Sequence, residues 1–245
     1  MTPPPPRPFQ SVGLCLFDLD YTLIRLTLDP IGAHVDLLRA AGHPFPRPRA
    51  RTAYDEAWDD YLQNGQRHPT QAAAYLNVVR RALSILGVDD PHDSLARRID
   101  DRINDVAAMC AYDDSVPVLE AVRHAGLEVA LATGRWHDPA PDLDSLRLTP
   151  YLDRSYYSGE FGHQKDDPKF WDALIAASGR PPAQILLIDD SPESVRTALA
   201  AGLCALSIRR DGSPLPPPPN PDLRSLSDLL PLLGLAVSTP PSDLP

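Results

Sequence analysis

Two aspartates that stand one residue apart are the first candidates for chemistry in this sequence. Asp18 and Asp20 follow directly after residues 12–17, a short apolar run typical of a buried strand. In an extended chain, residues two apart point to the same side, so both carboxylates are expected together at the end of the strand. Carboxylates held that close raise each other's pKa unless a cation or a proton lies between them. The pattern predicts a cation site or a shared proton, and the alternative is an ordinary acidic loop.

Three further sets of polar residues follow apolar runs along the chain. Thr133 and Gly134 follow one run, Asp189 and Asp190 follow another, and Lys165 lies between them in a loop rich in Gly and Asp. Each set alone has an ordinary interpretation, namely a turn, a group of helix N-caps or a solvated lysine. Together they offer carboxylates for a hard cation, a hydroxyl and amides for an anion, and one ammonium. Open α/β sheets bind ligands at the carboxyl ends of their strands, which is where these residues are expected.

The elements that must position these residues can be predicted from residue 113 onward. Apolar runs alternate with segments that have proline in their first turn and glycine after their last turn, as helices do. Strands alternating with helices indicate a parallel sheet covered on both faces. The predicted strands are 127–132, 185–188 and 204–208, and the predicted helices are 117–126, 168–179 and 192–202.

Residues 25–111 have a different character, because no strand pattern appears in them and the whole segment is predicted to be helical. The strongest helix covers 71–86, where apolar residues are spaced three and four apart and Gly87 ends the pattern. The other predicted helices are 31–41, 50–61 and 94–108.

The predicted fold class is α/β, with a Rossmann-like parallel sheet that carries helices on both faces and an inserted all-helical cap domain. The core domain would comprise residues 11–24 and 112–235, and the cap domain would comprise residues 25–111. Residues 1–10 form a proline-rich tail that is expected to be disordered, as is the tail 236–245.

Composition narrows the function classes. The net charge of −10 argues against a nucleic-acid partner, since binding a phosphate backbone requires a basic surface. No apolar run approaches the length of a membrane span, and the amino terminus lacks the apolar centre of a signal peptide. We therefore expect a cytoplasmic protein without a membrane partner, as a monomer or a homodimer. Its three cysteines show no metal-ligand spacing.

The order and spacing of these residues resemble the haloacid dehalogenase-like (HAD) hydrolase superfamily, in its capped phosphatase branch with a helical cap after the first motif. The resemblance covers residues 12–24 and about 112–210. The four motifs of the family are matched, in chain order, by Asp18 to Thr22, by Thr133, by Lys165, and by Asp190 with Asp189 beside it.

The resemblance implies a magnesium-dependent phosphatase that hydrolyses a small phosphorylated metabolite through an aspartyl-phosphate. Asp18 would be the nucleophile, and Asp20 would be the general acid and base, free to carry a proton. Mg²⁺ would be bound by the carboxylates of Asp18 and Asp190 and by the backbone carbonyl of Asp20. Asp189 is a further candidate ligand. Lys165 would be catalytic through its charge.

Substrate binding is assigned by the same resemblance to a set of residues that would surround the phosphoryl group, namely Thr22, Thr133, Gly134 and Lys165. Beyond the second motif, Arg135, Trp136 and His137 could touch substrate, or could have packing and surface roles. Basic residues of the predicted cap could bind a distal anion of the substrate, or form a solvated face. They are Arg47, Arg49, Arg51, His68, Arg80 and Arg81.

Two positions depart from the family pattern. Ser194 stands where many relatives carry an acid or asparagine, so the outer metal ligands are expected to differ, and Asp166 replaces the usual proline after the lysine. Asp20 argues against a dehalogenase. The absence of lysine between Asp20 and Asp113 argues against a Schiff-base phosphonate hydrolase. A phosphomutase of the same fold, or a non-catalytic binding or regulatory protein, stays an alternative.

Overall fold

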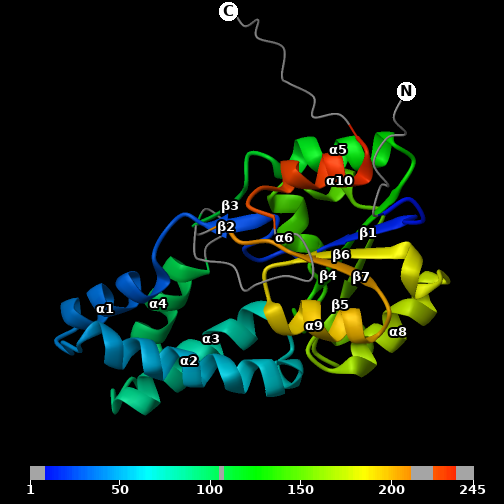
Figure 1. The fold of residues 1–245 in the computed structure, drawn as a ribbon. Coiled ribbons are helices and arrows are strands. Elements are labelled where there is room, and N and C mark those ends of the chain that lie inside the picture. Colours follow the sequence, from blue (N-terminus) through cyan, green and yellow to red (C-terminus); the bar gives the residue numbers. More distant parts are fainter. Residues whose placement is uncertain (1–8, 105–107, 211–222, 236–245) are drawn as a thin grey trace, which may run out of the picture.

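The computed structural model of this 245-residue protein describes residues 9–104, 108–210 and 223–235. The tails predicted to be disordered lie outside these ranges, apart from residues 9 and 10. A five-stranded parallel sheet in the order β5-β4-β1-β6-β7 forms the centre of the molecule (Figure 1). Its strands are β1 (Leu14–Phe17), β4 (Glu128–Thr133), β5 (Arg154–Tyr157), β6 (Ile185–Asp189) and β7 (Cys204–Ser207).

The register of the three central strands brings their carboxyl ends to one edge of the sheet. Phe17 of β1 lies beside Leu131 of β4 and beside Ile188 of β6. Asp18 and Asp189 come next on β1 and β6, and Thr133 ends β4 one residue further on, after Ala132. Asp18, Thr133 and Asp189 therefore meet at the same edge because their strands end together.

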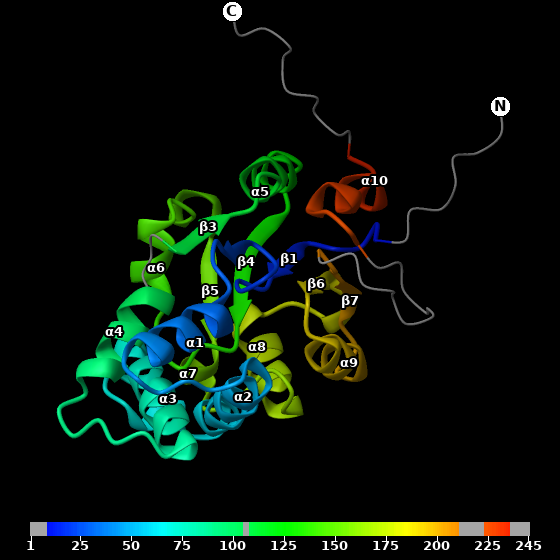
Figure 2. The same ribbon diagram turned by 90° about the vertical axis from the view of Figure 1, so that its left-hand side faces the viewer.

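Helices cover both faces of the sheet, since both faces of its central strands are apolar (Figure 2). On one face, alternate strand residues pack against α5 (Ser115–His124) and α10 (Leu229–Leu233). On the other face, the remaining strand residues pack against α8 (Pro168–Ser178) and α9 (Pro192–Ala200). Two short helices follow strands of the sheet: α6 (Ala140–Ser145) comes after β4, and α7 (Ser158–Phe161) comes directly after β5. The predicted α/β fold with helices on both faces is confirmed.

Local residue choices explain where α8 and α9 begin. The side chain of Asp167 accepts a hydrogen bond from the Lys169 amide, and that of Ser191 accepts one from the Ser194 amide. A proline follows each capping residue at the first helical position, where its missing amide costs nothing. The two helices predicted from this pattern are confirmed, and their first turns lie beside the polar edge of the sheet.

Four helices lie to one side of the sheet and are called the cap helices below (Figures 1 and 2). They are α1 (Pro30–Ala40), α2 (Arg47–Asn64), α3 (Gln71–Leu86) and α4 (Ser94–Ile103), with a 3₁₀ turn at Gly65–Arg67 after α2. Helix α3 has the predicted bounds because Thr70 caps it and Gly87 ends it in the left-handed conformation. None of the described helices is both long and apolar enough to cross a membrane.

The expectation that residues 25–111 contain no strand is wrong. Strand β2 (Ile24–Leu26) pairs antiparallel with β3 (Met109–Ala111), so the chain leaves for the cap helices and returns from them at one place. Helix α4 also ends at Ile103 rather than at 108. Strands of three residues are too short to show an alternating pattern. Edge strand β5 was also not predicted, since it begins with the exposed Arg154 and contains no aliphatic residue.

Candidate active site

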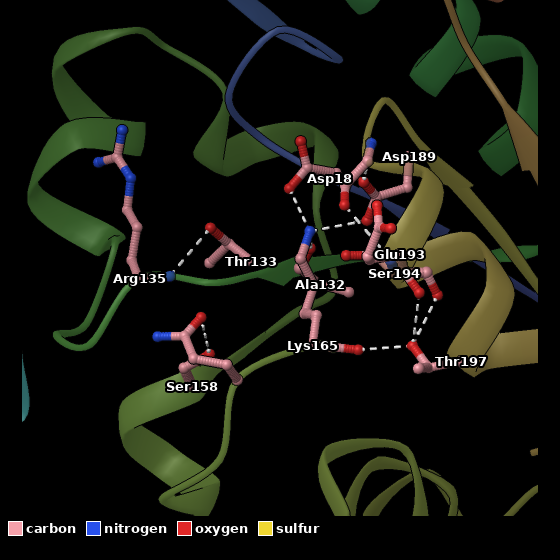
Figure 3. A network of polar contacts seen from close by, with 12 residues as sticks. Asp18, Ala132, Thr133, Arg135, Ser158, Lys165, Asp189, Glu193, Ser194 and Thr197 are labelled. Atoms are coloured by element: carbon pink, nitrogen blue, oxygen red, sulfur yellow. Dashed lines mark hydrogen bonds and ion pairs between the residues drawn. The ribbon is translucent and has the colours of Figure 1, made fainter. Parts of the chain in front are cut away.

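A buried lysine joins two carboxylates at the polar edge of the sheet (Figure 3). The Lys165 ammonium lies 2.5 Å from Oδ1 of Asp18 and 2.7 Å from Oδ2 of Asp189, and it donates to the Ala132 carbonyl at 3.3 Å. Burial by itself lowers the pKa of Lys165, but Asp18 and Asp189 outweigh that effect and raise the pKa above its usual value. The lysine is therefore a fixed positive charge at the end of strand β1.

Two residues that the sequence did not single out hold this lysine in place. Its backbone carbonyl accepts hydrogen bonds from Nε1 of Trp171 at 2.7 Å and from Oγ1 of Thr197 at 2.8 Å. Trp171 is fully buried on α8 and Thr197 is buried on α9, so both helices fix the loop that carries Lys165. Neither residue lies in a recognisable motif, and no pattern in the sequence predicted their meeting.

The carboxylates at this edge form a group suited to a hard cation. Asp18, Asp189 and Asp190 each offer an oxygen, and these oxygens lie within 4.8 Å of one another. Both oxygens of Asp189 are already engaged, one by Lys165 and the other by the Ser191 amide at 2.8 Å. In contrast, Oδ2 of Asp18 is buried without any hydrogen-bond partner. The orphaned oxygen of Asp18 and the carboxylate of Asp190 are thus the best placed ligands.

The same carboxylates are destabilised in the absence of a cation. Burial raises the pKa of Asp18 well above its usual value, and nearby Asp189, Asp190 and Asp20 add to the effect against the opposing influence of Lys165. Burial, followed by the charge of Asp189, raises the pKa of Asp190 to about 7. One lysine does not balance this set of acids. The donor set and the orphaned oxygen therefore fit a divalent cation bound through oxygen.

A cavity of about 410 Å³ opens above these groups, and most of the predicted site residues line it. Thr133 and Gly134 lie on its floor, and a side chain at Gly134 would bring its Cβ to 2.9 Å from Oε1 of Gln164. Glycine therefore lets the Gln164 side chain approach the backbone of this turn closely. Thr22 is different, since it is fully buried and does not line the cavity. Its assignment to substrate binding stays a prediction.

Asp20 is held by an arginine rather than being free. The guanidinium of Arg135 donates to Oδ1 of Asp20 at 2.8 Å and to Oδ2 at 3.1 Å, and it also binds the carboxylate of Asp142 on α6. The Arg135 side chain is only 3% exposed, so the pair is shielded from solvent on the arginine side. Asp20 was expected to have no charged partner, but its carboxylate is fixed by two charge-assisted hydrogen bonds from Arg135.

The next residue, Trp136, connects the core to the cap helices. Its indole nitrogen donates to the Tyr61 carbonyl on α2 at 2.9 Å. Gly65 and Gly159 pack so closely against Trp136 that neither position has room for a side chain. Trp136 is therefore a packing residue, which was one of its two interpretations from the sequence.

Ser194, at the position that departs from the family pattern, also lines the cavity beside Glu193. Its amide donates to the Ser191 hydroxyl at 3.3 Å, so the residue belongs to the first turn of α9. Because its hydroxyl carries no charge, it does not replace the acid of other relatives, and Glu193 supplies the nearest carboxylate in sequence.

These features define an α/β enzyme with a carboxylate and lysine site at the carboxyl edge of its sheet, beneath a set of inserted helices. Residues 12–202 match the family described as haloacid dehalogenase-like hydrolase. The protein belongs to this family, and the resemblance found in its sequence motifs is confirmed.

Individual relatives extend the comparison. The chain is 30% identical over 200 residues to Phosphoglycolate phosphatase 1 of Pseudomonas aeruginosa, covering 78% of this chain and 68% of the relative. It is 30% identical over 92 residues to the GMP/IMP nucleotidase YrfG of Escherichia coli, covering 37% of this chain and 41% of that protein. The match therefore spans less than half the length of YrfG.

Solved structures show the same fold. A crystal structure of a dehalogenase with an intermediate complex superimposes with a TM-score of 0.69 and 20% identity, covering 93% of this chain and 99% of the other. At this identity the likeness concerns the fold alone.

Proposed function

We propose that the protein is a Mg²⁺-dependent phosphatase that hydrolyses a small phosphorylated metabolite through an aspartyl-phosphate on Asp18. The observation that carries the proposal is the state of Asp18 itself. One of its oxygens is bound by Lys165, and the other is buried without a partner beside Asp190. A carboxylate in that position can bind a cation and present its oxygen to a phosphoryl group at the same time.

Different residues would bind the cation and the phosphoryl group. Asp18 and Asp190 would hold Mg²⁺, with the Asp20 carbonyl as a further ligand and Asp189 holding Lys165. Mg²⁺ when bound supplies positive charge that stabilises the phosphoryl oxygens. Lys165 adds a second positive charge, while Thr133 and Gly134 would contact the phosphoryl oxygens from the opposite side. Positioning and charge are the main requirements of phosphoryl transfer.

Two steps would follow from this arrangement. A carboxylate oxygen of Asp18 forms a bond to phosphorus while the bond to the leaving oxygen breaks, and Asp20 gives its proton to that oxygen. Water then attacks phosphorus as Asp20 takes its proton, which releases phosphate and restores Asp18. Each carboxylate oxygen has two lone pairs, so Asp20 can carry a proton without leaving Arg135.

The relatives support phosphatase chemistry, because those compared above are named for the removal of phosphate from small molecules. The structural likeness to a dehalogenase concerns the fold and not the activity, because the two sequences are only 20% identical. Asp20 supports phosphate transfer over dehalogenation, since a leaving alcohol needs a proton and a leaving halide does not.

The test is release of inorganic phosphate from p-nitrophenyl phosphate and from a panel of phosphorylated metabolites. We expect activity with Mg²⁺, none with EDTA, and recovery when Mg²⁺ is restored. Asp18→Asn should abolish the activity, whereas Asp36→Asn, a matched change at an exposed site on α1, should not. Full activity of Asp18→Asn would contradict the nucleophile. Transfer of phosphate between hydroxyls of one sugar without release would indicate a mutase.

A further inference from the structure

A second cavity lies beside the first and has Asp20 in its lining too. Its volume is about 260 Å³, and it shares Asp20, Tyr21, Trp58 and Tyr75 with the cavity above the carboxylates. A molecule with its phosphate beside Asp18 would therefore extend past these shared residues into the second cavity. The part that enters would be the leaving alcohol.

The wall of the second cavity on the cap side is made of aromatic rings. Tyr54 and Trp58 of α2 are nearly parallel, with ring planes 13° apart, and Trp58 and Tyr75 of α3 are 21° apart. Six further apolar residues line the cavity beside polar and charged ones, and they are Ile24, Leu26, Pro30, Ile31, Ile103 and Met109. Such a wall suits a flat, apolar group that can stack on a ring.

The charged groups around the second cavity are already engaged, so the lining offers no cluster of free cations for a second anionic group on the substrate. Arg51 lies 3.6 Å from Asp55, Arg25 donates to the Cys110 sulfur at 3.4 Å, and Asp20 is bound by Arg135. Of the six basic residues proposed from the sequence to bind a distal anion, only Arg51 lines either cavity. The others include Arg47 and Arg80, which pair with aspartates elsewhere in the cap helices or beside them.

Tyr21 faces this wall from the core side, in a conformation that its residue type disfavours. Its φ of 64° lies in the left-handed region, which bulky side chains rarely adopt and which glycine or asparagine would occupy readily. The residue is nevertheless 50% exposed and lines both cavities. A strained residue that presents its side chain to a cavity points to a contact with ligand.

We propose that the substrate is a phosphate monoester whose leaving alcohol carries a flat aromatic ring. This inference rests on the proposed phosphatase function and adds the substrate class to it. The phosphate lies beside Asp18, and the ring lies in the second cavity against Tyr21, Trp58 and Tyr54. The volume lies just below the range of about 300–1,000 Å³ typical of drug-sized ligands, so the cavity fits one ring system.

Two matched pairs of substrates measure the effect of the aromatic ring on kcat/KM. Adenosine 5′-monophosphate and ribose 5-phosphate release the same kind of primary alcohol, as do benzyl phosphate and ethyl phosphate, but only the first member of each pair carries a ring. We expect kcat/KM to be about 5- to 150-fold higher for the ring-bearing member, which is the range expected for stacking on aromatic side chains. Equal kcat/KM within both pairs would overturn the inference.

Variants test which residues provide the preference. Trp58→Leu removes the ring from the cap side, and Tyr21→Asn removes it from the core side while keeping a residue that tolerates the left-handed backbone. Each should reduce the ratio within a pair towards one. Ile85→Ala, at an exposed position on α3 that lines neither cavity, should keep the wild-type ratio. Wild-type ratios in both Trp58→Leu and Tyr21→Asn would also overturn the inference.

A binding measurement tests the aromatic site independently of the proposed phosphatase activity. The Asp18→Asn variant is titrated with each pair, and tighter binding of the ring-bearing member supports the aromatic site even if no phosphate is released by the wild-type enzyme. That combination would contradict only the phosphatase. Mg²⁺-dependent release of phosphate from all four compounds at equal kcat/KM would contradict only the aromatic site.

Discussion

The two sides of the active-site cavity are built on different principles. On the core side, the charged groups follow or face strand ends, and Lys165 is fixed by hydrogen bonds to Asp18 and Asp189. On the cap side, the lining includes a row of aromatic rings from α2 and α3, in which neighbouring rings are stacked or tilted against one another. The core side thus supplies the chemistry, and the cap side supplies a surface that selects by shape and polarity.

The largest effect on activity should come from substitution of Lys165 on the core side. Lys165→Met removes the positive charge between Asp18 and Asp189, and we expect kcat to fall about 10²- to 10³-fold, as for loss of a preorganised group at a transition state. Lys169→Met is the matched control, because Lys169 is the only other lysine in the sequence and lies exposed on α8. If a folded Lys165→Met variant kept the wild-type kcat, Lys165 would have no role in catalysis.

A buried histidine gives the cap helices a pH dependence of their own. His34 on α1 is fully buried, both of its ring nitrogens lack a partner, and burial lowers its pKa to about 4. The unfolded chain takes up the proton near the ordinary pKa of 6.5, whereas the folded chain does not. The stability is therefore complete above pH 6.5, and about 3 kcal/mol of it is lost as the pH falls to 4.

Denaturant unfolding of the wild type and of His34→Leu across pH 4–7 measures this contribution. The variant should lose less stability than the wild type over that range, because the histidine no longer titrates while every carboxylate is unchanged. Parallel pH curves for the two proteins would show that His34 contributes nothing to the acid sensitivity.

A smaller effect is expected where the two sides meet, at Arg135. Arg135→Gln loosens Asp20 without removing it, so proton transfer to the leaving oxygen should suffer most. We expect kcat/KM to fall about tenfold more for ethyl phosphate than for p-nitrophenyl phosphate, whose leaving group needs little help from an acid. Equal losses on both substrates would mean that Arg135 acts through structure alone.

Sequence reasoning succeeded on the core side for a physical reason. Buried parallel strands that end at one edge of a sheet must bring the residues at their ends together, so motifs at separate strand ends predicted the meeting of Asp18, Thr133 and Asp189. The helix of residues 71–86 was predicted equally well, because Thr70 and Gly87 mark its ends locally.

The cap side could not be predicted in the same way. The rings of Tyr54, Trp58 and Tyr75 come together through the packing of α2 on α3, and no local pattern encodes that geometry. The strands β2 and β3 were missed because each is three residues long and gains its partner from about 85 residues away. The fork of Arg135 on Asp20 likewise joins residues 115 apart in sequence.

Trapping of the phosphorylated enzyme tests the central claim most directly. The protein is mixed with Mg²⁺ and p-nitrophenyl phosphate, quenched during turnover, and treated with borohydride, which reduces an aspartyl-phosphate to homoserine. Peptide mass analysis should find homoserine at position 18, and none in Asp18→Asn. Efficient turnover with no modified residue, or with the modification at another aspartate, would contradict Asp18 as the nucleophile.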